Sequence, residues 1–179
     1  QAGSASAALA AAGGANVTVF EMRQDRMDEA RRLGNNVTAL YPYHDVVARK
    51  VAEADLVIGA VLITGAKAPH VMTREMLRDM EDGSVVVDIA IDQGGCFETS
   101  RPTTWKEPTY VEEGITHFCV TNMPGAVPQT SSQAICAAIL PWVNKLASGN
   151  DWRQNAALVK GINVEAGKIV HPALQGMQV

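Results

Sequence analysis

Apolar and polar positions follow two different patterns along the first two thirds of the chain. Short runs rich in β-branched residues recur between longer segments whose apolar residues are three or four positions apart. Short apolar runs are typical of strands buried on both faces of a parallel sheet, and the longer segments are typical of connecting helices. The runs predict five strands, at residues 17–20, 37–41, 56–61, 85–91 and 117–120. The other segments predict helices at residues 3–12, 25–33, 44–54, 73–80 and 131–146.

Strands that alternate with helices indicate an α/β fold, a doubly wound parallel sheet of the Rossmann type. The chain opens on a small-residue helix beginning at Gly3. We therefore expect the first strand of the sheet to be missing from this sequence, leaving strands 17–20 and 56–61 without the neighbour between them. Residues 1–150 are expected to form this truncated domain. Residues 151–179 are expected to form a C-terminal segment, with a helix at 151–159 and a hairpin around Glu165–Gly167.

Charge and composition exclude several classes of function. The net charge is −4, which does not favour nucleic acid as a partner. No apolar run reaches the roughly 18 residues that a membrane-spanning helix needs, so no membrane association is expected. Cys96, Cys119 and Cys136 lack metal-ligand spacing, and we interpret them as reduced thiols of a cytosolic protein with no metal site.

Asp92 is the strongest catalytic candidate. It ends the apolar run 85–91 and precedes Gly94 and Gly95. In open α/β sheets the ligand crevice lies outside the carboxyl ends of the strands, where a carboxylate can transfer a proton or orient a substrate amine or water. The alternative is structural, because Asp92 could instead cap its loop by accepting hydrogen bonds from the amides of Gly94 and Gly95.

A second acidic residue, Glu21, ends strand 17–20 and lies 18 residues after Gly3. An acid at this place can accept hydrogen bonds from the ribose hydroxyls of a dinucleotide, and it repels a 2′-phosphate, so it favours NAD over NADP. Arg23 and Arg26 could reach a phosphate, cover an adenine, or be solvated. Gly3 is either the last glycine of a dinucleotide fingerprint or a simple small-residue helix start.

Two further segments carry candidate ligands. After strand 56–61, the small residues Gly59 and Ala60 either let a ribose or pyrophosphate approach the backbone or pack tightly. After strand 117–120, Asn122 can bond a carboxamide or carboxylate, and Met123 can cover a nicotinamide ring. The structural alternative for this second segment is a rigid crossover into the next helix.

Three stretches taken together resemble the alanine dehydrogenase family. They are Asp55-Leu-Val-Ile-Gly-Ala-Val-Leu62 with the following Gly65-Ala-Lys-Ala-Pro69, then Val87-Asp-Ile-Ala-Ile-Asp-Gln-Gly-Gly95, and then Asn122-Met-Pro-Gly-Ala-Val-Pro128. The resemblance implies reversible, NAD-dependent oxidative deamination of L-alanine to pyruvate and ammonia. It also implies a cytoplasmic homo-oligomer, a hexamer.

The resemblance assigns roles to individual residues. Asp92 becomes the catalytic carboxylate and also a cofactor-binding residue. Glu21 becomes the acid that binds the adenosine ribose, and Arg26 a neighbour of the adenosine. Gly3 becomes the last fingerprint glycine. The remaining cofactor-binding residues implied by the resemblance are Ser4, Val61, Leu62, Ile89, Val120, Asn122 and Met123.

The resemblance is incomplete in one respect. The family binds pyruvate through a basic cluster in an N-terminal substrate domain, which this sequence lacks, so we expect the chain alone to be inactive. Two alternatives stay open: the NAD-binding subunit of proton-translocating transhydrogenase, and an NAD-binding module without chemistry of its own. The transhydrogenase motif tends to lack the carboxylate at Asp92, which favours alanine dehydrogenase.

Overall fold

The computed structural model describes residues 2–61, 69–149 and 152–174. Their contacts form two compact units, one up to Thr121 and the other from Asn122 onward. Within these described residues, no helix is both long and apolar enough to cross a membrane.

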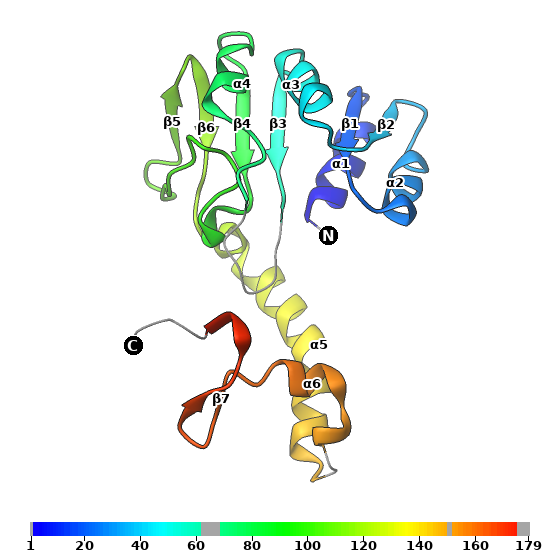
Figure 1. Ribbon diagram of the computed structural model, residues 1–179, viewed down its shortest axis with the longest axis vertical. Helices are drawn as coiled ribbons and strands as arrows, with labels where there is room; N and C mark the ends of the chain where they lie inside the picture. Colours follow the sequence, from blue (N-terminus) through cyan, green and yellow to red (C-terminus); the bar gives the residue numbers. More distant parts are fainter. Residues whose placement is uncertain (1, 62–68, 150–151, 175–179) are drawn as a thin grey trace. The chain divides into compact units, whose positions relative to one another are not determined.

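The strands of the first unit form two sheets (Figure 1). β1 (Val17–Phe20) and β2 (Val37–Leu40) pair in parallel. The second sheet has the order β3-β4-β6-β5. Three of its strands run parallel, β3 (Leu56–Gly59), β4 (Val85–Asp88) and β6 (Ile115–Phe118), and β5 (Thr109–Glu112) is an antiparallel edge strand. The predicted parallel α/β fold is confirmed.

Helix α1 joins the two sheets, because it packs against both β1 and β3. Among the described residues no hydrogen-bonded pairing connects β1 with β3. The helices of this unit are α1 (Ala2–Ala12), α2 (Gln24–Arg31), α3 (His44–Ala52) and α4 (Arg74–Arg78). Their order along the chain matches the predicted alternation, with ends that differ by a few residues.

The main hydrophobic core lies around β4 and α4. Its fully buried side chains include Leu77, Val86, Phe97 and Ile115. A smaller core forms where α2 packs on β1 and β2, around Met27, Ala30 and Ala39. Each sheet therefore has its own apolar core.

β4 is shorter than predicted. It ends at Asp88, and residues Ile91–Gln93 form a 3₁₀ turn, η1, instead of continuing the strand to Ile91. The reason is local: the Asp88 carboxylate accepts a hydrogen bond from the amide of Ala90, 2.9 Å away. A side chain that bonds the backbone two residues ahead favours a turn over an extended strand.

No strand is predicted between residues 91 and 117, but the structure has β5 there, paired with β6 in an antiparallel hairpin. The hairpin turns at Glu113 and Gly114, which both have positive φ angles, 52° and 76°. Two positive φ angles define a type I′ turn, in which glutamate is uncommon at the first position. Two cations hold Glu113 there: its carboxylate lies 2.8 Å from Arg74 and 3.0 Å from Arg78, both on α4.

In the second unit the predicted hairpin is confirmed, with its turn at Ala166 and Gly167 between β7 (Val164–Glu165) and β8 (Lys168–Ile169). The helix predicted over 151–159 is divided, because Asn155 caps a new helix by accepting bonds from the amides of Ala157 and Leu158. The other elements are η2 (Met123–Ala126), α5 (Pro128–Ala147), η3 (Trp152–Gln154), α6 (Ala156–Lys160) and η4 (Pro172–Leu174).

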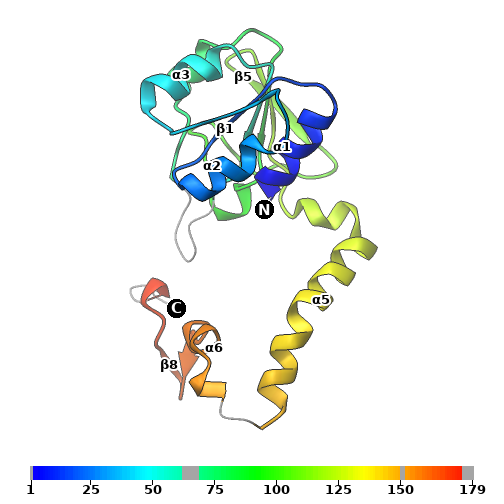
Figure 2. The ribbon, with the colours of Figure 1, turned by 90° about the vertical axis from the view of Figure 1, so that its right-hand side faces the viewer.

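Pro141 lies inside α5, which continues across it without ending, and Figure 2 shows the full length of this helix. A proline removes one backbone donor and strains the preceding turn, which a helix can absorb without ending.

The Glu113 ion pairs predict a specific dependence of stability on pH. Arg78 first, and then Arg74, lower the pKa of Glu113 from 4.5 to about 2. Because the pKa of Glu113 is lower in the folded state, its ionised form stabilises the fold at pH values above the unfolded pKa. This contribution is lost as the pH falls from about 4.5 through about 2. We expect Glu113→Gln to reduce the free energy of unfolding at pH 7, and the difference from wild type to vanish near pH 2.

Urea denaturation between pH 2 and 7 measures this difference. Glu81→Gln, on the loop that follows α4, is the matched control, for which we expect little change across the range. A Glu113→Gln deficit that is the same at every pH would show that the ion pairs do not stabilise the hairpin.

Candidate functional site

The start of α1 lies directly against the end of β3. A Cβ atom added at Gly3 would lie 3.0 Å from the Cβ of Ala60, closer than most Cβ atoms ever approach another atom. Only a residue without a side chain fits this contact easily. Close packing of helix on strand is what the last glycine of a dinucleotide fingerprint provides.

Gly59, at the end of β3, also serves packing. A Cβ there would overlap the sulfur of Cys96 and lie 2.6 Å from the ring of Phe97. Of the two alternatives for this small-residue strand end, the structure shows tight packing. The loop around residues 96–97 therefore fills the space beside the Gly59 backbone.

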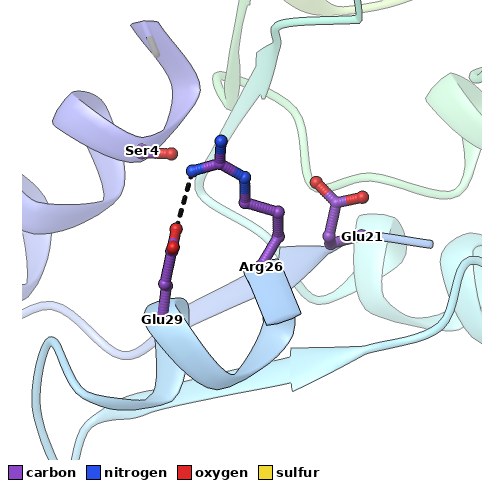
Figure 3. A pocket seen from close by; sticks show the side chains of 4 residues that line it. All are labelled: Ser4, Glu21, Arg26 and Glu29. Carbon is purple, nitrogen blue, oxygen red and sulfur yellow. Dashed lines mark hydrogen bonds and ion pairs between the residues drawn. The ribbon is translucent and has the colours of Figure 1, made fainter. Parts of the chain in front are cut away.

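Four side chains line a cleft of about 360 Å³ beside the end of β1 (Figure 3). Ser4 comes from the first turn of α1, Glu21 follows β1 directly, and Arg26 and Glu29 come from α2. Three of these residues were selected from the sequence as cofactor-binding candidates. Glu29 was not, although its position three residues after Arg26 places both on one face of a helix.

Glu21 is held in place by the backbone that follows it. Its Oε1 accepts hydrogen bonds from the amides of Met22 and Arg23, at 2.8 and 3.0 Å. The Arg23 guanidinium turns to Asp25, 2.6 Å away, and Arg23 is not among the residues that line the cleft. The strand end thus presents a carboxylate whose orientation is fixed.

Arg26 forms an ion pair within the cleft. Its Nη1 lies 2.7 Å from Oε2 of Glu29, and both side chains are about half exposed, at 52% and 56%. The described lining therefore holds two carboxylates, one guanidinium and one hydroxyl. This set of groups can recognise hydroxyls and a planar ring, and it is unfavourable for a further anion.

Asp88, which the sequence analysis did not single out, organises the loop after β4. It is fully buried, and its carboxylate accepts hydrogen bonds from the amides of Ala90 and Cys96 and from the hydroxyl of Ser100. The Cys96 thiol also donates to it, at 3.4 Å. Burial, and then the charge of Asp88, raise the pKa of Cys96, so this thiol remains a donor.

The far side of this loop is fixed by an aromatic pair. The ring of His117 stacks on Tyr110, whose hydroxyl donates to the carbonyl of Thr99. His117 Nδ1 lies 2.9 Å from the carbonyl of Ile115 and must donate to it, so Nε2 accepts from the Thr99 hydroxyl at 2.8 Å. Burial lowers the pKa of His117. A neutral imidazole with both ring nitrogens hydrogen-bonded has a structural role.

Asp92 lies in η1 and is exposed. The amides that it was expected to cap donate elsewhere: Gly94 bonds the carbonyl of Ile91 at 3.0 Å, and Gly95 bonds that of Ala90 at 3.2 Å. These contacts do not support the structural alternative for Asp92. Its carboxylate stands at the surface of a loop that other residues hold.

The other candidates are distributed over several strand ends. Val61 and Ile89 follow the paired strands β3 and β4, and both are half-buried. Val120 follows β6 and is fully buried. Asn122, with a φ of 49°, and Met123, which begins η2, belong to the second unit. Leu62 lies outside the described residues.

Comparison with known proteins gives consistent matches. The family model described as "Alanine dehydrogenase/PNT, C-terminal domain" matches residues 1–172. An alanine dehydrogenase of Halomonas elongata is 48% identical over 166 residues, which are 90% of this chain and 44% of that protein. The chain thus spans about half the length of the curated relatives it matches.

Two solved structures are also similar. An L-alanine dehydrogenase superimposes with a TM-score of 0.81 and 44% identity, covering 93% of this chain and 47% of that one. A transhydrogenase from Sinorhizobium meliloti has a TM-score of 0.77 and 28% identity, covering 96% and 47%.

The hydrogen bonds of Asp88 predict that Asp88→Asn lowers the free energy of unfolding substantially. Asp88→Asn replaces one acceptor oxygen by a donor, which faces the buried amide and hydroxyl donors around it. An unsatisfied buried donor costs about 1–3 kcal/mol, so we expect the free energy of unfolding to fall by at least about 2 kcal/mol. Urea denaturation measures the loss.

Ser100→Ala is the matched comparison, because it removes one donor and leaves the acceptor in place. We expect it to cost less than Asp88→Asn. If the two variants were equally stable, Asp88 would not be the organising residue of this loop.

Proposed function

This chain belongs to the alanine dehydrogenase/PNT C-terminal domain family, and from this premise we propose that it is the nucleotide-binding half of an NAD-dependent alanine dehydrogenase. The proposed reaction is the reversible oxidative deamination of L-alanine to pyruvate and ammonia. NAD, when bound, supplies the hydride acceptor. Groups that bind pyruvate would come from the half of the relatives that this chain does not span.

The observation that carries the proposal is the convergence of Ser4, Glu21 and Arg26 on one cleft. Their chemistry fits an adenosine ribose and its neighbours. Glu21 can accept bonds from ribose hydroxyls, Arg26 can cover a ring, and Ser4 stands in the first turn of α1, where helix amides favour a phosphate. The close contact of Gly3 with Ala60 keeps this first turn against the sheet.

Asp92 is the proposed catalytic carboxylate. It lies just beyond the carboxyl end of β4 and is exposed, whereas Asp88 anchors the loop from inside. An accessible carboxylate oxygen can take a proton from the substrate amine or from water, or orient that amine. The buried contacts of Asp88 would keep the loop, and with it Asp92, in a constant position.

Similarity favours alanine dehydrogenase over the transhydrogenase alternative. Identity to the alanine dehydrogenases is 48% and 44%, against 28% for the transhydrogenase structure, over similar shares of this chain. The presence of Asp92 points the same way. We further propose, from the family resemblance, a cytoplasmic homo-oligomer, with six copies of the complete protein.

The role of Asp92 is tested in the full-length enzyme. Asp92→Asn is expected to lower kcat by at least about 10²-fold, because it removes the group that exchanges a proton. NADH affinity should change little, since the cleft lined by Glu21 is untouched. Steady-state turnover assays measure kcat, and NADH fluorescence titrations measure the affinity for NADH. Asp45→Asn, an exposed acid at the start of α3, is the control, and full activity of Asp92→Asn would refute the assignment.

The role of Glu21 is tested by the choice of cofactor. We expect the full-length enzyme to prefer NAD, because a carboxylate repels a 2′-phosphate. Glu21→Ser keeps a hydrogen-bonding group, removes the charge and should shift the kcat/KM ratio toward NADP. Steady-state kinetics with both cofactors give this ratio. Wild-type enzyme that used NADP as well as NAD would contradict the role of Glu21.

A further inference from the structure

We infer that Glu29 is a specificity-determining residue of the cleft, which acts by holding Arg26 in an ion pair and so denies that cation to a 2′-phosphate. The inference rests on the proposed function, since it concerns how the same cleft tells two nicotinamide cofactors apart. Glu29 would be a positioning residue, because it acts through Arg26.

The geometry shows that Arg26 is already engaged. Its guanidinium lies 2.7 Å from the Glu29 carboxylate. Figure 3 shows the guanidinium reaching toward Ser4 and Glu29, and away from Glu21. Among the residues that line the described cleft, Arg26 is the single cation.

Charge explains why this pairing matters. A phosphate monoester carries about −1.5 to −2 charges at neutral pH, and its binding sites use arginine as a planar, charged donor. The lining holds two carboxylates and one guanidinium, so it has no excess positive charge. Glu21 repels the phosphate, and Glu29 removes the attraction that could offset this repulsion.

The ion pair should matter much less for NAD. A ribose 2′-hydroxyl is neutral and can donate to the Glu21 carboxylate without help from a cation. Since the pair is about half exposed, it contributes little to stability, and its loss should leave the fold intact. Removing the charge of Glu29 is therefore expected to change the ratio of NADPH affinity to NADH affinity.

The test uses the full-length enzyme and equilibrium binding, followed by the fluorescence of NADH and NADPH. Glu29→Gln keeps the size of the side chain and removes its charge. We expect NADPH to bind about tenfold more tightly, a change of about 1.4 kcal/mol, while NADH affinity stays within about twofold. The gain should disappear when Glu29→Gln is combined with Arg26→Ala.

Asp28→Asn is the matched control. Asp28 precedes Glu29 on α2 and is 48% exposed, but it pairs with Arg31 at 2.9 Å and does not line the cleft. It removes the same charge from the same helix, so it should leave the ratio of NADPH to NADH affinity near the wild-type value.

The possible outcomes separate the inference from the function on which it rests. Wild-type enzyme that bound neither nucleotide would overturn both. Wild-type binding of NADH, with an unchanged ratio in Glu29→Gln, would overturn the inference alone. So would an equal shift in Asp28→Asn, which would indicate a general charge effect, or a gain that persisted without Arg26.

Discussion

A single buried carboxylate, Asp88, is the constraint on which the arrangement around β4 depends. Taking a charge into the core is costly unless several donors surround it. Here two backbone amides, a hydroxyl and a thiol do so. Each donor comes from the segment after β4, so the hydrogen bonds to the Asp88 carboxylate form only when this loop is folded. The same folding brings Cys96 and Phe97 against the backbone of Gly59, where no side chain would fit.

The cleft beside β1 depends on a contact of a different kind. Gly3 and Ala60 are small enough for α1 to approach the end of β3 closely. Because α1 also packs on β1, this approach sets where Ser4 stands relative to Glu21. The two sheets have no strand pairing between them among the described residues, so packing through α1 carries the alignment that hydrogen bonds provide elsewhere.

Much of this arrangement could be predicted from the sequence, because its signals are local. Apolar runs gave the parallel strands, and the acid that ends the run 17–20 identified Glu21. Asp88 could not be recognised from the pattern alone, because it lies inside the apolar run 85–91, which predicts one strand. A single carboxylate in such a run is itself a sign of a buried, hydrogen-bonded residue. The β5–β6 turn was missed because Glu113 is a poor residue for it, and the ion pairs that compensate come from α4, distant in sequence.

Asp88 and Asp92 have identical side chains, but they differ in burial and therefore in the roles that they can have. They are four residues apart and belong to the same turn of chain, yet one is enclosed by donors and the other is exposed. Replacing a carboxylate that accepts several buried hydrogen bonds leaves those donors unsatisfied, so the role of Asp88 is structural. The amides of Gly94 and Gly95 bond the backbone carbonyls of Ile91 and Ala90. The hydrogen bonds of Asp88 therefore hold the loop from inside, while Asp92, the proposed catalytic carboxylate, lies at its surface.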